Sequence, residues 1–347
     1  MISVGLLTIV MLIELGLLVF AVVLFFAHGL WLGTSQRRLS RLTAAGRDSL
    51  ARLVTSGAVN VEDMAALESL PKDVQVISFL EISRNLTGTG KERLRFVAQR
   101  IGVVDRARAL CVHRRWQRRL RGARILSQLD VADPLVQTLL ADEHPAVRAQ
   151  AAEWAASQPS VPVISSMLEL LADPATQARF AVQNALLRMG SVVAGPLRDF
   201  LEKHTGRAAE AGLRVAESLA EASFGPAALT HSRSEEVPIR VASAKLLGAI
   251  ADAAAAERLV ELIRDEESRV RAAAAQALGR MQHWQAGSLL ADSLRDRTWR
   301  VRREAGLALR AIGAAGVLYL RRALKGDDRF AADMAQQVLD LPEAAAG

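Results

Sequence analysis

A polar turn that recurs at nearly constant spacing along most of the sequence constrains its fold more than any other feature. Seven such turns begin at residues 142, 173, 204, 234, 265, 296 and 327. The period of about 31 residues is typical of repeat proteins, in which each unit buries its apolar face against its neighbours. The period therefore predicts a stack of similar units over residues 131–342.

Each unit has the pattern of two short helices joined by its turn. Before the turn at Asp265, apolar residues such as Leu259 and Ile263 recur at helical spacing, and the alanine-rich segment RVRAAAAQALGRMQ follows the turn. The chain is 51% hydrophobic but only 4% aromatic, a composition that suits closely packed helices. We therefore expect an all-α fold, with Gly279 at the C-terminus of the second helix of its unit.

The unit resembles a HEAT repeat of the short bacterial type that is also found in phycobilin lyases. The resemblance rests on turns such as DEHPAVR, DPATQAR, DEESRVR and DRTWRVR, and it covers residues 131–342. It implies an α-solenoid of about seven to eight helical hairpins, in which the Asp of the turn and the following Arg form a hydrogen-bonded ladder between units. The ladder residues implied in this way are Asp142, Arg148, Asp173, Arg179, Arg240, Asp265, Arg271, Asp296 and Arg302.

Some units depart from this pattern. The turn at His204 reads HTGRAAE and has Glu210 in place of the Arg. This change predicts that the ladder is interrupted there and that the array can bend at this point. The last turn has Asp333 at that position, as expected of a terminal capping unit. Upstream, the turn signature is lost near Cys111 although helical spacing persists, and residues 62–130 are predicted to form a degenerate N-terminal HEAT-like cap.

Residues 1–32 form an apolar run that contains only Glu14 and His28 as polar interruptions. The run is longer than the roughly 20 residues that cross a bilayer, and it lacks the basic start of a signal peptide. Basic residues such as Arg37 and Arg38 follow it. We therefore expect a transmembrane helix at residues 1–33, with the N-terminus outside and the rest cytoplasmic. Glu14 either faces a partner helix in the membrane or lies at its outer interface.

The basic excess of the chain is confined to one region. Residues 33–125 hold 19 Lys and Arg against 8 Asp and Glu, whereas residues 126–347 hold 25 against 28. The overall charge of +7 therefore does not indicate a nucleic-acid-binding array. Residues 34–61 are interpreted as a basic amphipathic connector. Eight arginines lie close together further on: Arg106, Arg108, Arg114, Arg115, Arg118, Arg119, Arg121 and Arg124.

Two groups of residues are candidates for binding. On a single helix, Val112, Trp116, Leu120 and Ala123 would share one face, so that the eight arginines spread over the remainder. Such a surface could bind anionic lipid headgroups, an acidic partner or a nucleotide, or it could be a solvated face paired with acidic neighbours.

The second group surrounds Trp299, which occupies a turn position that is usually polar. Arg300 and Arg303 lie beside it in the sequence. An exposed Trp among arginines resembles an interaction hot spot, whereas the alternative is that the ring packs over the next unit.

The sequence predicts no catalytic residue, metal ligand or cofactor. None of its 6 histidines is followed by Glu or paired at metal-ligand spacing, and the single Cys cannot form an internal disulfide.

The favoured function is a membrane-anchored cytoplasmic scaffold or regulator for a protein partner. Similar single-span HEAT-repeat proteins suggest an integral membrane enzyme, such as a glycosyltransferase or polysaccharide synthase. The alternatives are an anionic-lipid or ligand sensor and a lyase-like or nucleic-acid-modifying enzyme. Residues 343–347 are expected to form a tail.

Overall fold

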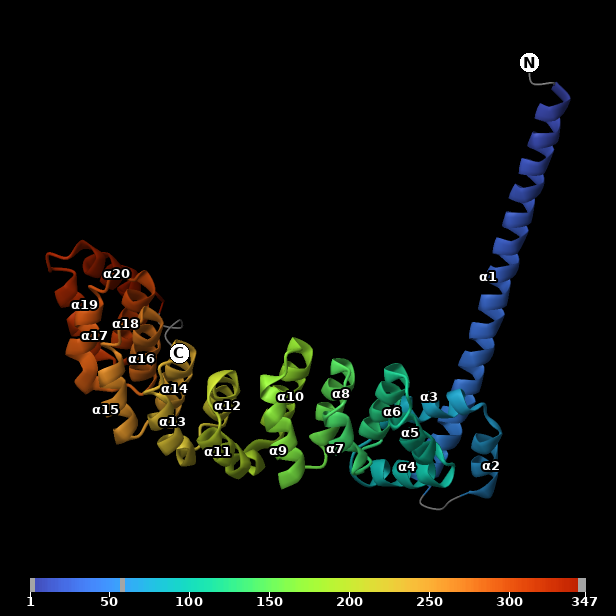
Figure 1. Cartoon of the computed structure of the whole chain (residues 1–347), viewed down its shortest axis with the longest axis horizontal. Coiled ribbons are helices and arrows are strands. Elements are labelled where there is room, and N and C mark those ends of the chain that lie inside the picture. Colours follow the sequence, from blue (N-terminus) through green and yellow to red (C-terminus); the bar gives the residue numbers. More distant parts are fainter. Residues whose placement is uncertain (1–3, 57–59, 343–347) are drawn as a thin grey trace. The chain divides into compact units, whose positions relative to one another are not determined.

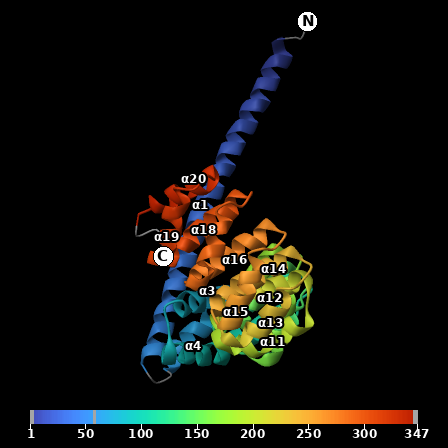
Figure 2. The ribbon, with the colours of Figure 1, turned by 90° about the vertical axis from the view of Figure 1, so that its left-hand side faces the viewer.

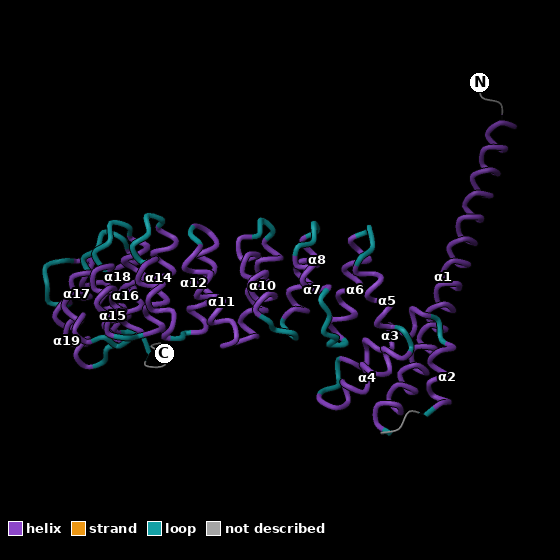
Figure 3. The backbone as a smooth tube through the Cα atoms, turned by 60° about the horizontal axis from the view of Figure 1, so that its bottom comes forward, coloured by secondary structure: helices purple, strands orange, loops and turns teal. Residues whose placement is uncertain are grey.

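The structure is a computed structural model that describes residues 4–56 and 60–342. These residues lie in helices and turns, and none of them lies in a strand (Figures 1 and 3), which confirms the predicted all-α class. The chain divides into two compact units, Met1–Val131 and Ala132–Gly347, which are described separately as unit 1 and unit 2. The predicted tail at residues 343–347 lies outside the described residues.

Unit 1 has its core where the C-terminal part of its first helix packs against the next three. The helices described in it are α1 (Val4–Thr55), α2 (Val61–Ser69), α3 (Lys72–Ser83), α4 (Gly88–Arg100), α5 (Val103–Cys111) and α6 (Trp116–Gln128). Leu50 and Leu53 of α1 are buried, and α1 contacts α2, α3 and α4. Helices α5 and α6 pack against each other as a hairpin.

Helix α1 is continuous over 52 residues, so no break separates the predicted connector from the apolar run before it. Its N-terminal half stands clear of α2 to α6 (Figure 1), and Leu17, Leu18 and Phe20 on it are exposed. Within the described residues, no helix has both the length and the apolarity needed to cross a membrane, which does not fit the predicted transmembrane helix at residues 1–33. The side chain of Glu14 lies outside the described part of the chain.

Unit 2, over its described residues, is a series of seven helical hairpins, in agreement with the seven turns of the sequence. The first helices of the hairpins are α7 (Leu135–Leu140), α9 (Val161–Glu169), α11 (Ala194–Lys203), α13 (Gly225–His231), α15 (Ala253–Leu262), α17 (Gly287–Ser293) and α19 (Ala314–Ala323). The second helices are α8 (Pro145–Ala155), α10 (Thr176–Met189), α12 (Gly206–Leu219), α14 (Val237–Ile250), α16 (Ser268–Arg280), α18 (Trp299–Ala311) and α20 (Arg329–Leu339). Short 3-10 turns, η1 (Leu170–Ala172), η2 (Gly190–Val193), η3 (Ala222–Phe224) and η4 (Trp284–Ala286), adjoin four of the first helices.

The second helices of unit 2 pack side by side in chain order, as Figure 2 shows for α12, α14, α16 and α18. Small residues allow a close approach. A Cβ added to Gly279 would lie 2.6 Å from Cα of Ala308 and 2.7 Å from its Cβ, and Gly248 stands in the same relation to Ala277. Gly279 is the penultimate residue of α16, at the predicted C-terminal end of the helix, and it also makes the close contact with α18.

A residue with a positive φ recurs shortly after the end of four of the second helices. Ala220, Ala251, Gln282 and Gly313 have φ angles of 51°, 59°, 51° and 84°, and they occupy the same position in successive repeats. A left-handed residue just after a helix redirects the chain and satisfies its last carbonyl groups. The repeat therefore fixes the backbone conformation at this position even where the side chain is not glycine.

Candidate functional site

The arginine ladder joins neighbouring units at three junctions within the described residues of unit 2. Nε and Nη2 of Arg148 donate to the carboxylate of Asp173 at 2.6 and 2.9 Å. Its Nη1 donates to the main-chain oxygens of Asp142 and Glu143 in the turn of its own unit, at 2.7 and 3.0 Å. Each arginine therefore holds its own turn through carbonyl groups and the following turn through a carboxylate.

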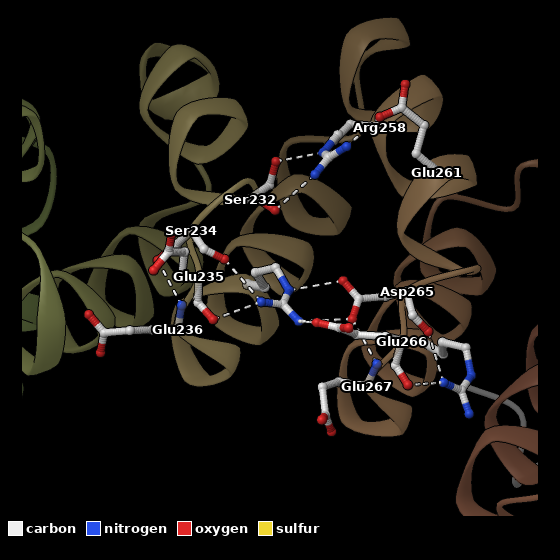
Figure 4. Close-up of polar contacts among 11 residues, drawn as sticks. Ser232, Ser234, Glu235, Glu236, Arg258, Glu261, Asp265, Glu266 and Glu267 are labelled. Carbon is white, nitrogen blue, oxygen red and sulfur yellow. Dashed lines mark hydrogen bonds and ion pairs between the residues drawn. The ribbon is translucent and has the colours of Figure 1, made fainter.

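The same arrangement recurs further along unit 2. Arg240 donates to both carboxylate oxygens of Asp265 at 2.9 and 3.0 Å, in the region shown in Figure 4. Arg271 donates in the same way to Asp296 at 2.7 and 3.1 Å. Because these side chains are largely buried and occupied by one another, they serve packing and are not available to a ligand.

The ladder carboxyls differ electrostatically from ordinary surface acids. Burial by itself would raise the pKa of Asp173 and of Asp296. Hydrogen bonds from Arg148 and from the N–H of Ala175 outweigh this effect and hold the pKa of Asp173 below its usual value. Arg271 and the N–H of Thr298 act in the same way on the pKa of Asp296. Both carboxyls are therefore ionised at neutral pH.

The ladder is interrupted between α10 and α12, as the sequence predicts. Arg179 donates to the carbonyls of Asp173 and Pro174 at 2.5 and 3.1 Å, but it contacts no carboxylate among the described residues. The residue at the position of the next aspartate is His204, whose ring stacks on Phe200 with the centroids 4.0 Å apart. Of all neighbouring second helices in unit 2, α10 and α12 pack together least extensively.

A second change in the ladder occurs at α18, where an aromatic surface replaces the ion pair. Arg302 keeps its bond to the carbonyl of Asp296 at 2.9 Å, but its guanidinium lies over the ring of Phe330, 5.0 Å from the centroid. Arg303 lies 5.9 Å from the centroid of Trp299. Trp299 and Phe330 are 55% and 61% exposed. We call these four residues the aromatic edge.

The exposure of Trp299 does not fit the interpretation in which its ring is buried under the next unit. The interaction hot spot stays a prediction. Phe330 was missed by reasoning from the sequence, although it lies one repeat period after Trp299 and therefore at the equivalent position. Arg300 lies apart from the aromatic edge, in a depression that Arg214, Lys245 and Arg269 also line.

In unit 1, the arginine-rich segment forms two helices and not the single helix predicted. Helix α5 ends at Cys111, and Val112, which was expected on the apolar face, is 69% exposed in the turn. Nδ1 of His113 accepts a hydrogen bond from the N–H of Arg115 at 3.0 Å. His144 makes the equivalent bond at the start of α8, so the hairpin pattern of the repeats continues into unit 1.

Several of the eight arginines are engaged within unit 1. Arg119 donates to the carbonyls of His113 and Arg114, both at 3.1 Å, which is the contact that ladder arginines make with their own turn. The other engaged side chains contact different groups: Arg106 with Gln75, Arg108 with Asp105, Arg118 with His113 and Arg121 with Asp73. These contacts bind together the helices that the arginines cover.

The remaining three side chains, those of Arg114, Arg115 and Arg124, are exposed and make no hydrogen bond or ion pair within the described residues. We call the pair α5 and α6 with these three cations the arginine hairpin. The pKa of His113 is lowered, mainly because the ring loses solvation. The positive charges of the neighbouring arginines lower it further; these are Arg118, Arg114, Arg115 and Arg119. The turn is therefore a region of positive potential that disfavours a further positive charge.

In the described part of the chain, a bound metal ion would require His, Cys, Asp or Glu side chains in a suitable geometry. No group of His, Cys, Asp and Glu residues there is arranged to hold a metal ion.

Comparisons with known proteins agree with the repeat architecture. No curated protein matches the sequence. Among solved structures, an engineered protein is similar at 17% identity over 80% of this chain and 87% of that chain, with a TM-score of 0.38. The complex of CpcE and CpcF of phycocyanin lyase from Nostoc sp. PCC7120 is similar at 20% identity over 59% and 92%, with a TM-score of 0.36. Both TM-scores are too low to support an argument.

The yeast importin-β Kap95p, in its structure with RanGDP, is similar at 11% identity over 84% of this chain and 50% of that chain, with a TM-score of 0.50. This likeness concerns the fold alone. The family of HEAT repeats matches residues 226–339, which are the hairpins from α13 to α20. Over its described residues, unit 2 is thus an all-helical solenoid whose residues 226–339 match the family of HEAT repeats.

Proposed function

We propose that the protein is a scaffold that binds a protein partner through the aromatic edge of unit 2. The observation that carries the proposal is a pair of exposed rings, Trp299 and Phe330, at equivalent positions of adjacent units, each with an arginine over its face. Trp and Arg are the residues most enriched among interface hot spots, and cation–π contacts hold the rings in place before binding.

The repeat fold supports a binding role. HEAT units offer an extended surface made of successive helices, and such surfaces suit long contacts with another protein. Kap95p, which shares the fold, is described in its structures as binding RanGDP and Nup1. We further infer, from the apolar N-terminal sequence, that the partner of this chain is an integral membrane protein. The resemblance to single-span HEAT-repeat proteins suggests a glycosyltransferase or polysaccharide synthase.

The test compares partner recovery by three forms of the full-length protein isolated from detergent-solubilised membranes. The edge variant carries Trp299→Ser and Phe330→Ser. The control variant carries Trp284→Ser and Leu318→Ser, two apolar residues of unit 2 that are 65% and 66% exposed. Because each hot-spot residue contributes about 2 kcal/mol or more, we expect the edge variant to recover at least about tenfold less partner, whereas the control matches the wild type. Equal recovery by all three forms would refute the proposal.

A second candidate function is contact with an anionic lipid surface through the arginine hairpin. It is favoured by the three unpaired cations and by the exposed apolar residues of α1, which belongs to the same unit. Each basic residue near an anionic membrane contributes roughly 1 kcal/mol. We expect Arg114→Glu with Arg115→Glu to weaken flotation of the full chain with vesicles that contain phosphatidylserine, but not with pure phosphatidylcholine vesicles. Arg84→Glu with Arg100→Glu in the same unit is the control, and equal losses in both variants would argue against a specific lipid-binding hairpin.

A further inference from the structure

A basic depression lies on the surface of the second helices of unit 2, separate from the aromatic edge. It is lined by Arg214 of α12, Lys245 of α14, Arg269 of α16 and Arg300 of α18, and its volume is about 170 Å³. Its one acidic residue is Glu304. We call the four basic residues the cationic cradle. Four consecutive second helices of unit 2 therefore each contribute one basic residue to the same depression.

The charges of the cradle lack the partners that the ladder arginines have. Lys245, Arg269 and Arg300 make no ion pair or hydrogen bond within the described part of the chain. Arg214 is paired only with Glu210 on its own helix, at 2.5 Å.

Glu304 does not neutralise the cradle, because its carboxylate lies 2.9 Å from Nη1 of Arg303. The unpaired cations of Lys245, Arg269 and Arg300 therefore repel one another, and a bound anion would relieve the repulsion.

The repeat sets the spacing of these charges. Arg214 and Lys245 are one repeat period apart, and so are Arg269 and Arg300, so each pair occupies one position on neighbouring helices. Packed helices lie roughly 8–10 Å apart, and an extended chain rises about 3.3 Å per residue. Within each pair, an extended segment that crosses the two helices would therefore bring about every third side chain to the next cation.

We propose that the cationic cradle binds an extended acidic segment of the protein partner, with carboxylates about three residues apart. The inference rests on the proposed function and names the chemistry of the partner. Glu304, which lines the depression, is paired with Arg303 of the aromatic edge, so a segment that leaves the cradle past Glu304 meets the aromatic edge. The two surfaces then act as one binding site with a charged part and an aromatic part.

The walls of the depression favour carboxylates over phosphate. Val241, Ala272 and Ala273 line it from inside helices, where main-chain N–H groups are already bonded, so it lacks the free N–H donors typical of phosphate sites. The guanidinium groups of Arg214, Arg269 and Arg300 can each bind a carboxylate through two parallel hydrogen bonds.

The test uses two fluorescein-labelled peptides of equal composition and the full-length protein. One peptide has Glu at every third residue within a Gly and Ser background, and the other has the same glutamates clustered at one end. Fluorescence anisotropy is expected to show at least about tenfold tighter binding of the spaced peptide. Equal affinities, or displacement of the spaced peptide by an equimolar amount of inorganic phosphate, would overturn the proposal.

Two matched variants locate the site. Lys245→Gln with Arg269→Gln removes two charges from the cradle, and Arg264→Gln with Arg321→Gln removes two exposed charges elsewhere in unit 2. We expect the cradle variant to lose at least about tenfold in affinity for the spaced peptide while its melting temperature does not fall, because repulsion has been removed. The control variant should bind like the wild type. Unchanged binding by the cradle variant would refute the assignment.

Partner capture separates this proposal from the proposed function. If the aromatic-edge variant and the cradle variant both lose the partner, the acidic-segment assignment is supported. If only the edge variant loses the partner, the cradle is overturned while the scaffold function stands. If both variants recover as much partner as the wild type, the scaffold function at this surface is overturned.

Discussion

The ladder aspartates show how a single side chain couples two units. Asp296 accepts two hydrogen bonds from Arg271 of the preceding unit and one from the N–H of Thr298 in its own turn. The identities of the ladder residues follow from their recurrence in the sequence. Their pairing, from each arginine to the aspartate of the next turn, follows only when the units are stacked.

This arrangement predicts a dependence of stability on pH. The pKa of Asp296 in the folded protein lies below its ordinary value of 3.8, so the unfolded chain takes up the proton more readily. The stabilisation is therefore complete above pH 3.8 and is lost as the pH falls from there through the folded-state pKa. Urea unfolding of the wild type, followed by Trp fluorescence over this range, should show the loss.

The Asp296→Asn variant isolates the contribution of this residue. We expect it to be less stable at neutral pH by about 1–3 kcal/mol, because charge-assisted hydrogen bonds to Arg271 are lost, and to vary less with pH in the acidic range. Asp292→Asn, at an exposed residue of α17, is the control and should follow the wild type. Parallel pH curves for all three proteins would contradict the assignment.

Other residues show why the sequence alone could not locate the binding surfaces. Arg214 and Lys245 look like ordinary solvated cations on separate helices, and they converge only through the packing of α12 and α14. Arg119 is expected to bind lipid or a partner because it belongs to the run of eight arginines, yet it contacts its turn as a ladder arginine does.

At the scale of the element, the end of α16 depends on two residues, of which the sequence analysis named only Gly279. Gly279 allows the close approach of α18, while Gln282, in the turn that follows, adopts the left-handed conformation that ends the helix. The helical spacing located the segment, but the requirement for close approach depends on a neighbouring helix that the local sequence does not show.

Substitutions at these two positions should have opposite effects. Gly279→Ala is expected to destabilise the protein by about 1–3 kcal/mol, because the new Cβ overlaps Ala308. Gln282→Gly is expected to stabilise it by about 1 kcal/mol, because glycine adopts a positive φ without strain. Thermal and urea unfolding measure both changes.

The control for helix propensity is Gly195→Ala in α11, where an added Cβ meets nothing within 4 Å. This variant should be neutral or more stable by up to about 1 kcal/mol. Destabilisation by Gly195→Ala equal to that of Gly279→Ala would show that close packing is not the cause.

At the scale of the whole molecule, the period predicted the number of hairpins in unit 2 and the place where the ladder stops. It could not predict that α1 runs without a break to Thr55, because no turn residue marks that boundary. It also could not predict that the arginine-rich segment folds back on itself, because the turn there depends on His113 and Arg115 and lacks the recurrent aspartate.

The interruption at His204 determines how unit 2 responds to force. Neighbouring repeats influence each other only through their shared interface, so the weakly packed contact between α10 and α12 is the most compliant joint of the array. A partner bound across α12, α14, α16 and α18 would hold those four helices together as one rigid segment. The hairpins from α7 to α10 would still flex at the joint, and tension applied through the bound partner would open the array there first.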